Sequence, residues 1–474
     1  PHIGFALEVI QADALARFWR SQGDEVFFNT GTDEHGIKIF NKARQSNLEP
    51  KVFADNISQK FKDILVELNI TQDINFIRTT DKQHVAAAQE FWKRVEKNGF
   101  IYKKLYKVKY CNGCELEKTD SELDNGHCAL HPNQEIEIRE EENYFFKYSA
   151  FQAKLLKLYA SNPDFVLPHT RFNEIKAFVE RGLEDFSISR LASKMPWGIP
   201  VPDEEANLSV GRQTMYVWFD ALVNYISAIG WPHSAEATRG KPGTFFDWWP
   251  VIQLAGKDNL RQQTAMWQAM LMAANLPPSK QIIIHGFITS GGQKMSKSLG
   301  NVINPLEIVK DYGTDALRYY LLRHVHPFED SDFTLEKFKE SYNAHLANGL
   351  GNLVSRVMKL SELYLTEAKP RIIRGFASVE SPAEITEAMA GYNYNLAMDY
   401  IWAKIGAADA YVQSTEPFKT IKTDPEKAKT DIRYLVNELA TIAYLLQPFL
   451  PAMSAKISAT IASNHPSEPL FMRK

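Results

Sequence analysis

The 474-residue chain has few cysteines, little net charge and no long apolar segment. Its three cysteines are too few for a disulfide framework. The 54 basic and 57 acidic residues give a formal net charge of −3, so any nucleic-acid-binding surface must be local. No apolar run is long enough to span a bilayer, and no low-complexity tract is present. These absences favour a globular protein that does not span a membrane.

The composition indicates a well-packed chain with more than one core. Hydrophobic residues make up 45% of the sequence and aromatic residues 12%. Such values are typical of globular proteins, and a chain of this length is expected to form about three domains.

The three cysteines fall in one short window. Cys111 and Cys114 form a C-x-x-C pair, and Cys128 is followed by His131 as C-x-x-H. Three thiolates and one imidazole at this spacing predict a tetrahedral zinc site. Because four protein ligands leave no open position, we expect one structural zinc ion in residues 111–131. The alternative is a chance cluster of reduced cysteines.

A short basic segment follows two consecutive glycines near the middle of the chain. Lys294 and Lys297 alternate with Ser296 and Ser298, which brings two cations and two hydroxyl groups together. This combination suits a polyphosphate whose negative charge grows as a bond breaks. The alternative is a solvated basic turn, which is what most short lysine runs are.

The beginning of the chain predicts a second phosphate-binding element. Residues 6–19 have apolar side chains at helical spacing, preceded by His2 and Gly4. Free backbone N–H groups at a helix start bind phosphate, and glycine allows close approach. Residues 25–30 read as a buried strand leading to Asp33, a candidate partner for a substrate ammonium group. For Asp33 alone, a loop cap is the alternative.

Apolar segments at 215–225, 251–255 and 281–285 are separated by helical segments, which is typical of a doubly wound parallel sheet. We therefore predict an α/β Rossmann-like catalytic sheet, split by a zinc-bearing insertion and followed by an all-α helical bundle. The bundle could also serve only packing or oligomerisation. The predicted domains are residues 1–98, residues 99–210 with the zinc knuckle, residues 211–332 and residues 333–474.

Several motifs together resemble one enzyme family. The segment His2–Phe5 and the segment Lys294–Ser298 resemble the paired signature of class I aminoacyl-tRNA synthetases. The single zinc knuckle is similar to one form of methionyl-tRNA synthetase. Further segments that resemble methionyl-tRNA synthetase are residues 30–36, 181–185, 216–222, 256–258 and 447–451.

The resemblance implies ATP-dependent ligation of L-methionine to tRNA(Met) through methionyl-adenylate, with Mg²⁺ accompanying ATP. It implies that His2, Lys294 and Lys297 are catalytic. The residues it implies for ATP are His2, Gly4, Lys294, Ser296, Lys297 and Ser298. Those for methionine are Asp33, Trp218, Ala221, Leu222, Tyr225, Asp258 and Trp267, although each aromatic could simply be core. Those for the anticodon are Asn352, Arg356 and Phe418.

This chain differs from the family pattern in three ways, and each difference leads to an expectation. Phe5 replaces a second histidine and cannot hydrogen-bond phosphate, so adenylate formation could slow on the order of 10²-fold or more. Arg261, Gln262 and Gln263 occupy positions where the family usually shows an aromatic and a histidine, so amino-acid selectivity is looser or differently built. The family's strand before the first motif is missing, which indicates truncation or damage.

Two alternatives stay open at this point. One is another class I synthetase of the leucine, isoleucine, valine or cysteine group. The other is a catalytically impaired synthetase-like protein that binds tRNA. We expect a monomer located in the cytoplasm, with an organelle also possible.

Overall fold

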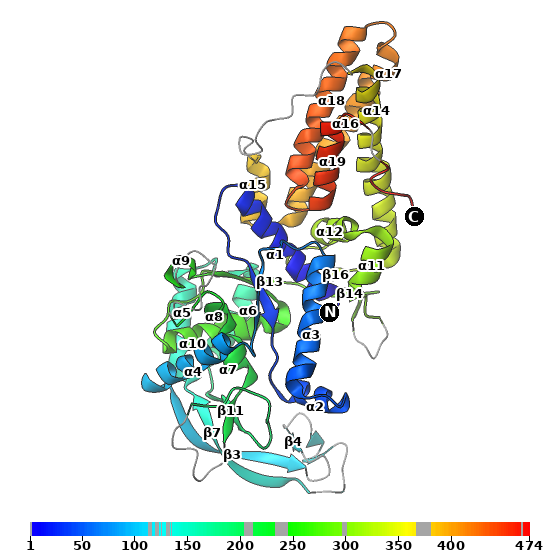
Figure 1. Ribbon diagram of the computed structural model, residues 1–474. Helices are drawn as coiled ribbons and strands as arrows, with labels where there is room; N and C mark the ends of the chain where they lie inside the picture. The colour runs from blue at the N-terminus through cyan, green and yellow to red at the C-terminus, as the bar shows by residue number, and fades with distance from the viewer. Residues whose placement is uncertain are drawn as a thin grey trace.

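The computed structural model describes residues 2–111, 116–118, 123–124, 126–128, 133, 135–202, 212–232, 245–295, 301–365, 381–465 and 468–474. An α/β body occupies the centre of the molecule (Figure 1). A helical bundle extends from one end of this body, and a long β-ribbon extends from the other. The mixed α/β class and the helical C-terminal part are therefore as predicted.

The first parallel pair of strands follows a long helix. Helix α1 (Ile3–Ser21) precedes β1 (Asn29–Thr32), which pairs in parallel with β2 (Asn75–Arg78). The strand predicted at 25–30 has the wrong bounds, because pairing with β2 begins only at Asn29. Helices that surround this pair are α2 (Ile37–Gln45), α3 (Pro50–Glu67) and α4 (Lys82–Lys97).

The second parallel sheet contains three strands. Strands β12 (Ile252–Gly256) and β13 (Gln281–His285) pair in parallel, as predicted. The third strand is β8 (Val166–Leu167), which comes from the span predicted as the insertion. The prediction that residue 215 begins a strand of this sheet is wrong. Strand β11 (Gln213–Met215) pairs antiparallel with β10 (Ser189–Leu191) instead.

The β-ribbon carries the predicted zinc segment. Strands β3 (Ile101–Cys111) and β7 (Glu137–Phe146) pair antiparallel along nearly their whole length. Cys111 ends β3, and Cys128 lies in the short strand β6 (His127–Cys128). The side chains of both cysteines lie outside the described residues, as do Cys114 and His131. Within the part of the chain that the structure describes, no group of three or more side chains could hold a metal ion.

The C-terminal part is helical, as its periodicity predicts. Its helices pack through one continuous apolar core that also includes residues of α1. The elements are α11 (Pro305–Tyr312), α12 (Thr314–Arg323), α13 (Leu335–Ser341), the π-helix η6 (Tyr342–Gly351), α14 (Asn352–Tyr364), α15 (Ala383–Ala390), α16 (Tyr394–Thr415), α17 (Pro417–Thr420), α18 (Pro425–Leu446) and α19 (Pro451–Ser463). Among the described helices, none has the length and apolar character needed to cross a membrane.

Candidate active site

The carboxyl ends of the parallel strands meet the start of α1. Glu8 on α1 accepts a hydrogen bond from Nε2 of His285, at the end of β13, over 2.9 Å. Asp258 follows β12 and lies close enough to His2 to act on its ring electrostatically, although burial outweighs this effect and lowers the pKa of His2. Open α/β sheets bind ligands at this edge. The sequence motifs at His2 and Asp258 therefore converge here.

The backbone amides at the start of α1 are already hydrogen-bonded. The Gly4 N–H donates to Nδ1 of His2 over 3.0 Å, and the Ile3 N–H donates to the Ile303 carbonyl over 3.3 Å. The Phe5 N–H donates to the His2 carbonyl over 3.0 Å. These amides therefore have partners in the structure, and phosphate binding at this helix start stays a prediction.

Gly4 is instead needed by the His2 ring. A Cβ atom at Gly4 would lie 2.8 Å from Cε1 of His2 and 2.9 Å from Nδ1. Because Nδ1 accepts the Gly4 N–H, a neutral His2 ring carries its proton on Nε2. Burial lowers the pKa of His2, which favours this neutral form. His2 can thus offer one outward N–H donor.

Phe5, which stands where the family has a second histidine, is a packing residue in this structure. The Phe5 ring packs edge-on against Phe61 of α3, with ring centroids 4.9 Å apart. The side chain thus contributes to the apolar contact between α1 and α3 and supplies no hydrogen bond.

The loop that carries Asp33 is fixed by its neighbour Glu34. The Glu34 carboxylate is buried and accepts two hydrogen bonds from Arg78, at 2.7 and 2.9 Å. The Trp197 indole N–H donates to the Glu34 carbonyl over 2.6 Å. A bidentate ion pair of this kind gives geometric specificity, so the loop holds Asp33 in a defined position. Sequence reasoning missed Arg78 and Trp197, because neither lies near the motif.

The pKa values of two carboxyl groups in this region are shifted in opposite directions. Burial acts to raise the pKa of Asp220, but the hydrogen bond from Nδ1 of His35 over 3.1 Å and the His84 ring, whose Nε2 lies 3.8 Å from Oδ1, outweigh it and lower the pKa overall. Asp33 keeps an accessible surface, yet the protein atoms that crowd its carboxyl group, together with Asp220, raise its pKa to about 6. A cation that binds beside Asp33 would relieve the repulsion between the two carboxylates.

The residues predicted to hold methionine divide into lining and core residues. Trp218 and Tyr225 are half-buried, whereas Ala221 and Leu222 are almost fully buried. Trp267 is fully buried and packs behind Tyr225, with ring centroids 6.2 Å apart. Trp267, which was also predicted to hold methionine, therefore lies in the core behind the site.

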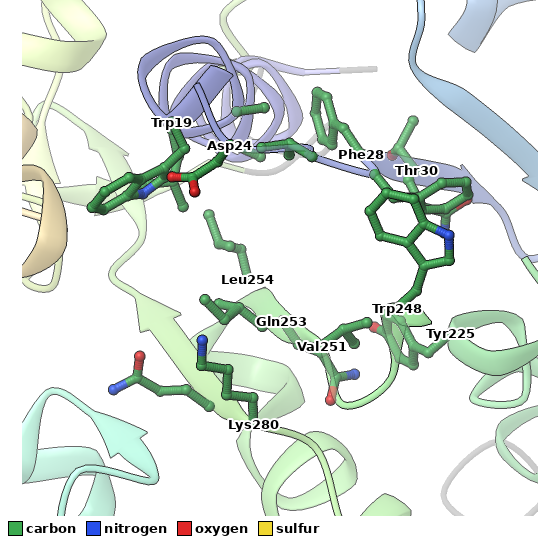
Figure 2. A pocket seen from close by; sticks show the side chains of 18 of the residues that line it. Trp19, Asp24, Phe28, Thr30, Tyr225, Trp248, Val251, Gln253, Leu254 and Lys280 are labelled. Atoms are coloured by element: carbon green, nitrogen blue, oxygen red, sulfur yellow. The ribbon is translucent and has the colours of Figure 1, made fainter. Parts of the chain in front are cut away.

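A cavity of about 670 Å³ separates the two parallel sheets. Figure 2 shows Trp19, Asp24 and Phe28 on one side and Val251 and Gln253 on the other. Among the described residues, β1 pairs only with β2, and β12 pairs only with β13, so the facing strand edges border this cavity. Tyr225 also lines the cavity, which connects it to the predicted methionine pocket.

The basic segment begins in a small sheet near this edge. Lys294 lies in β15 (Gln293–Lys294), which pairs antiparallel with β14 (Ile288–Ser290). The turn between these strands needs its glycines, because Gly291 and Gly292 have φ angles of 60° and 73°. The Lys294 side chain and residues Ser296, Lys297 and Ser298 lie outside the described residues.

The predicted anticodon residues lie on the helical bundle. Asn352 is exposed at the start of α14, and Phe418 in α17 keeps 42% of its surface exposed. Arg356 is half-buried and forms an ion pair of 2.9 Å with Asp409 of α16. The pairing with Asp409 could not be found from the sequence.

The split parallel sheet, the histidine at the start of α1 and the lysine segment after β13 define a class I tRNA synthetase. The family model described as "tRNA synthetases class I (M)" matches residues 1–128 and 112–358. The model described as "Anticodon binding domain of methionyl tRNA ligase" matches residues 377–470. The chain belongs to the methionyl family of class I tRNA synthetases.

Named relatives agree over nearly the whole chain. The "Methionine--tRNA ligase" of Synechocystis sp. is 39% identical over 96% of this chain and 86% of its own length. The "Methionine--tRNA ligase, chloroplastic/mitochondrial" of Arabidopsis thaliana is 39% identical over 96% of this chain and 74% of its own length. The structure of Mycobacterium tuberculosis methionyl-tRNA synthetase in complex with methionyl-adenylate is 32% identical, with a TM-score of 0.82. The match covers 100% of this chain and 96% of that one.

Proposed function

We propose that this chain joins L-methionine to tRNA(Met) at the expense of ATP. In the first step the methionine carboxylate attacks the α-phosphorus of ATP, which is bound with Mg²⁺, and pyrophosphate leaves. In the second step the terminal ribose hydroxyl of the tRNA displaces AMP from the methionyl-adenylate. The observation that carries the proposal is the position of Asp33, which follows the carboxyl end of β1 and lies near enough to Tyr225 of the cavity wall to act electrostatically on its hydroxyl.

Each reacting group has a residue suited to it. Asp33 takes the methionine ammonium group, and Trp218 with Tyr225 forms the wall that faces the thioether. The Nε2–H of His2 donates to a phosphate oxygen of ATP, with Gly4 allowing the ring to adopt its position. Catalysis of this kind depends mostly on positioning and on stabilising developing charge.

Positively charged side chains are needed to stabilise the negative charge of the leaving pyrophosphate. We assign this role to Lys294 and Lys297, with Ser296 and Ser298 as hydroxyl donors. The place of Lys294 on β15, which follows the parallel strand β13 with only β14 between them, supports the assignment. Asp258 lies at the same edge, beside His2, and completes the set around ATP and methionine.

We propose further that Cys111, Cys114, Cys128 and His131 hold one structural zinc ion. Three thiolates and an imidazole are the donor set that zinc prefers, so the residues present fit the metal. The ion would fix the segment at the end of the β3–β7 ribbon and would contribute no reacting group. The finer domain boundaries, 1–98, 99–210, 211–332 and 333–474, belong to this proposal.

The helical bundle would bind the anticodon of tRNA(Met). Asn352 and Arg356 lie one turn apart on α14 and can offer base-edge hydrogen bonds. Phe418 offers an exposed ring on which an unpaired base can stack. A monomer in the cytoplasm remains the prediction for the assembly and the location.

The direct test is product formation by the 474-residue chain. With radiolabelled methionine, ATP, Mg²⁺ and tRNA(Met), we expect methionyl-adenylate on the enzyme and methionyl-tRNA in solution. Labelled leucine, isoleucine, valine and cysteine serve as controls and should give neither product. Retained tRNA binding without any adenylate would favour the impaired tRNA-binding protein.

A further inference from the structure

A tight turn lies at the base of the lysine segment. Strands β14 and β15 pair up to Ser290 and Gln293, so only Gly291 and Gly292 connect them. Both glycines have positive φ angles, as the two central residues of a type I′ hairpin turn require. The closing hydrogen bond of such a turn joins the residues before and after the central pair. The Gly292 N–H is therefore not used by the hairpin itself and needs a partner from outside.

Asp332 supplies the partner for this amide. The Gly292 N–H donates to Oδ1 of Asp332 over 2.8 Å, and the Thr289 hydroxyl donates to the same oxygen over 3.1 Å. A carboxylate that accepts a backbone N–H forms a charge-assisted hydrogen bond, which is stronger than a neutral one. The bond from Gly292 makes the largest contribution to lowering the pKa of Asp332, so this side chain is a carboxylate at neutral pH.

A parallel strand holds Asp332 beside the hairpin. Strand β16 (Ser331–Asp332) pairs with β14, and Asp332 lies directly opposite Thr289 (Figure 1). The next residue continues the pairing, because the Phe333 N–H donates to the Thr289 carbonyl over 2.9 Å. The backbone of Asp332 is thus fixed relative to β14, and its side chain can hold the turn that follows this strand.

The second oxygen of the carboxylate points to a different partner. Oδ2 of Asp332 lies 3.5 Å from Nζ of Lys337, whose side chain is 59% exposed. Exposed ion pairs contribute little to stability. The position of Oδ1, rather than the pairing of Oδ2, is therefore the property on which the turn depends.

The start of β14 is tied to the edge of the parallel sheet. Asp330 accepts the Phe287 N–H over 2.9 Å, and its two oxygens accept from Nζ of Lys257 at 2.7 and 2.6 Å. Lys257 directly follows β12 and precedes Asp258, which the proposed function places beside ATP. Two carboxylates, those of Asp330 and Asp332, thus hold β14 at its two ends.

Strand β15 depends on this support. It has only two residues, and among the described strands it pairs only with β14. A two-stranded hairpin by itself is marginally stable at best in water. The bond between Gly292 and Asp332 therefore decides how precisely the chain is directed from the turn to Lys294.

We infer that Asp332 is a positioning residue that acts through the Gly292 amide to fix the strand on which Lys294 lies. The inference rests on the proposed function, in which Lys294 stabilises the leaving pyrophosphate. A misplacement of about 1 Å can cost on the order of 10²-fold in rate, even when it arises far from the reacting atoms. Because other residues bind methionine, a loosened turn should lower kcat for methionine activation and leave the KM for methionine unchanged.

Two substitutions separate the position of the oxygen from its charge. Asp332→Asn keeps an oxygen at the place of Oδ1 without the charge, so kcat for methionine-dependent ATP–pyrophosphate exchange should fall at most about threefold. Asp332→Glu keeps the charge and moves the carboxylate by one methylene group, so kcat should fall roughly tenfold or more. The KM for methionine should change less than about twofold in both variants. Lys337→Ala removes the partner of Oδ2 and is the matched control, with an unchanged kcat.

A double variant shows whether the effect passes through Lys294. Lys294→Ala alone should lower kcat, and adding Asp332→Glu should lower it no further. If Asp332→Glu fails to fold, Asp332→Ala, which removes the oxygen altogether, takes its place in both measurements.

Three results would overturn the inference while the proposed function stands. They are a normal kcat in Asp332→Glu, an Asp332→Asn enzyme as slow as Asp332→Glu, and additive losses in the double variant. Absence of methionine-dependent exchange in the unmodified chain would instead overturn the proposed function and, with it, the role of Lys294 that Asp332 supports.

Discussion

Arg318 of α12 and Asp13 of α1 form an ion pair of 2.7 Å in which both side chains are completely buried. The same guanidinium donates to the carbonyl groups of Phe449, at 2.7 Å, and of Leu68 and Pro448, each at 3.3 Å. One side chain thus joins α1, the helix that His2 precedes, to the turn between α18 and α19. The catalytic part and the helical bundle share this contact, so the orientation of α1 depends on both.

Removing this guanidinium should destabilise the protein strongly. Arg318→Met leaves a buried carboxylate and several carbonyl groups without their partner, which costs about 3–5 kcal/mol. Asp13 keeps its bonds to Arg17 and to the Thr71 N–H, so the lower part of that range is expected. The measurement is chemical denaturation. Lys51→Ala, which breaks an exposed pair with Asp55, is the control and should cost at most about 1 kcal/mol. Equal effects of the two variants would contradict the account.

Adding one methyl group at Gly4 should impair the first reaction step. The new Cβ would lie within 3 Å of the His2 ring and displace it, so adenylate formation should slow roughly a hundredfold. The double variant His2→Ala/Gly4→Ala should be no slower than His2→Ala. Gly406→Ala is the control, since a Cβ there meets nothing within 4 Å, and it should leave the rate unchanged. A Gly4→Ala enzyme of normal rate would show that the His2 ring position does not matter.

The affinity for methionine should depend on the ionisation of Asp33. Its pKa is raised to about 6, so the carboxylate form is present above that pH and is lost as the pH falls through it. The KM for methionine should therefore rise below about pH 6, by roughly tenfold per pH unit once Asp33 is mostly protonated. Asp33→Asn should show a high KM that does not follow this profile. The same pH profile in the Asn variant would exclude Asp33 as the ammonium partner.

Zinc binding can be tested without measuring activity. Cys111→Ser and His131→Ala should each reduce the zinc content, measured by atomic absorption on the purified protein, from one ion per chain to nearly none. His127→Ala is a matched control, because His127 lies beside Cys128 and is not in the proposed ligand set. Full zinc content in Cys111→Ser would refute the ligand set.

The fold was predictable where local patterns decide it. Helix α1, the strands β12 and β13 and the long helices of the bundle all follow from apolar periodicity. The partners of the strands were not predictable in the same way. Strand β8 has only two residues, whereas the residues that follow Met215 are as apolar as those of a central strand usually are. Which of them joins β13 depends on tertiary packing, which periodicity does not contain.

The site was predictable from motifs but not from the contacts that hold them. Asp33 and His2 stand in recognisable segments, whereas Arg78 is an ordinary residue at the end of a strand. Trp267, predicted to line the pocket, lies against Phe91 in the core, because a buried aromatic has the same sequence pattern in either place. From the sequence, Gln263 could be recognised only as a departure from the family pattern. The structure adds its hydrogen bond to Tyr225.

The central claim is that this chain activates methionine, and methionine-dependent exchange of labelled pyrophosphate into ATP tests it most directly. The assay needs only the 474-residue chain, ATP, Mg²⁺ and the amino acid, so it does not depend on tRNA. We predict exchange with methionine and none above background with leucine, isoleucine, valine or cysteine. Exchange with one of these four but not with methionine, or no exchange with any amino acid while tRNA still binds, would contradict the account.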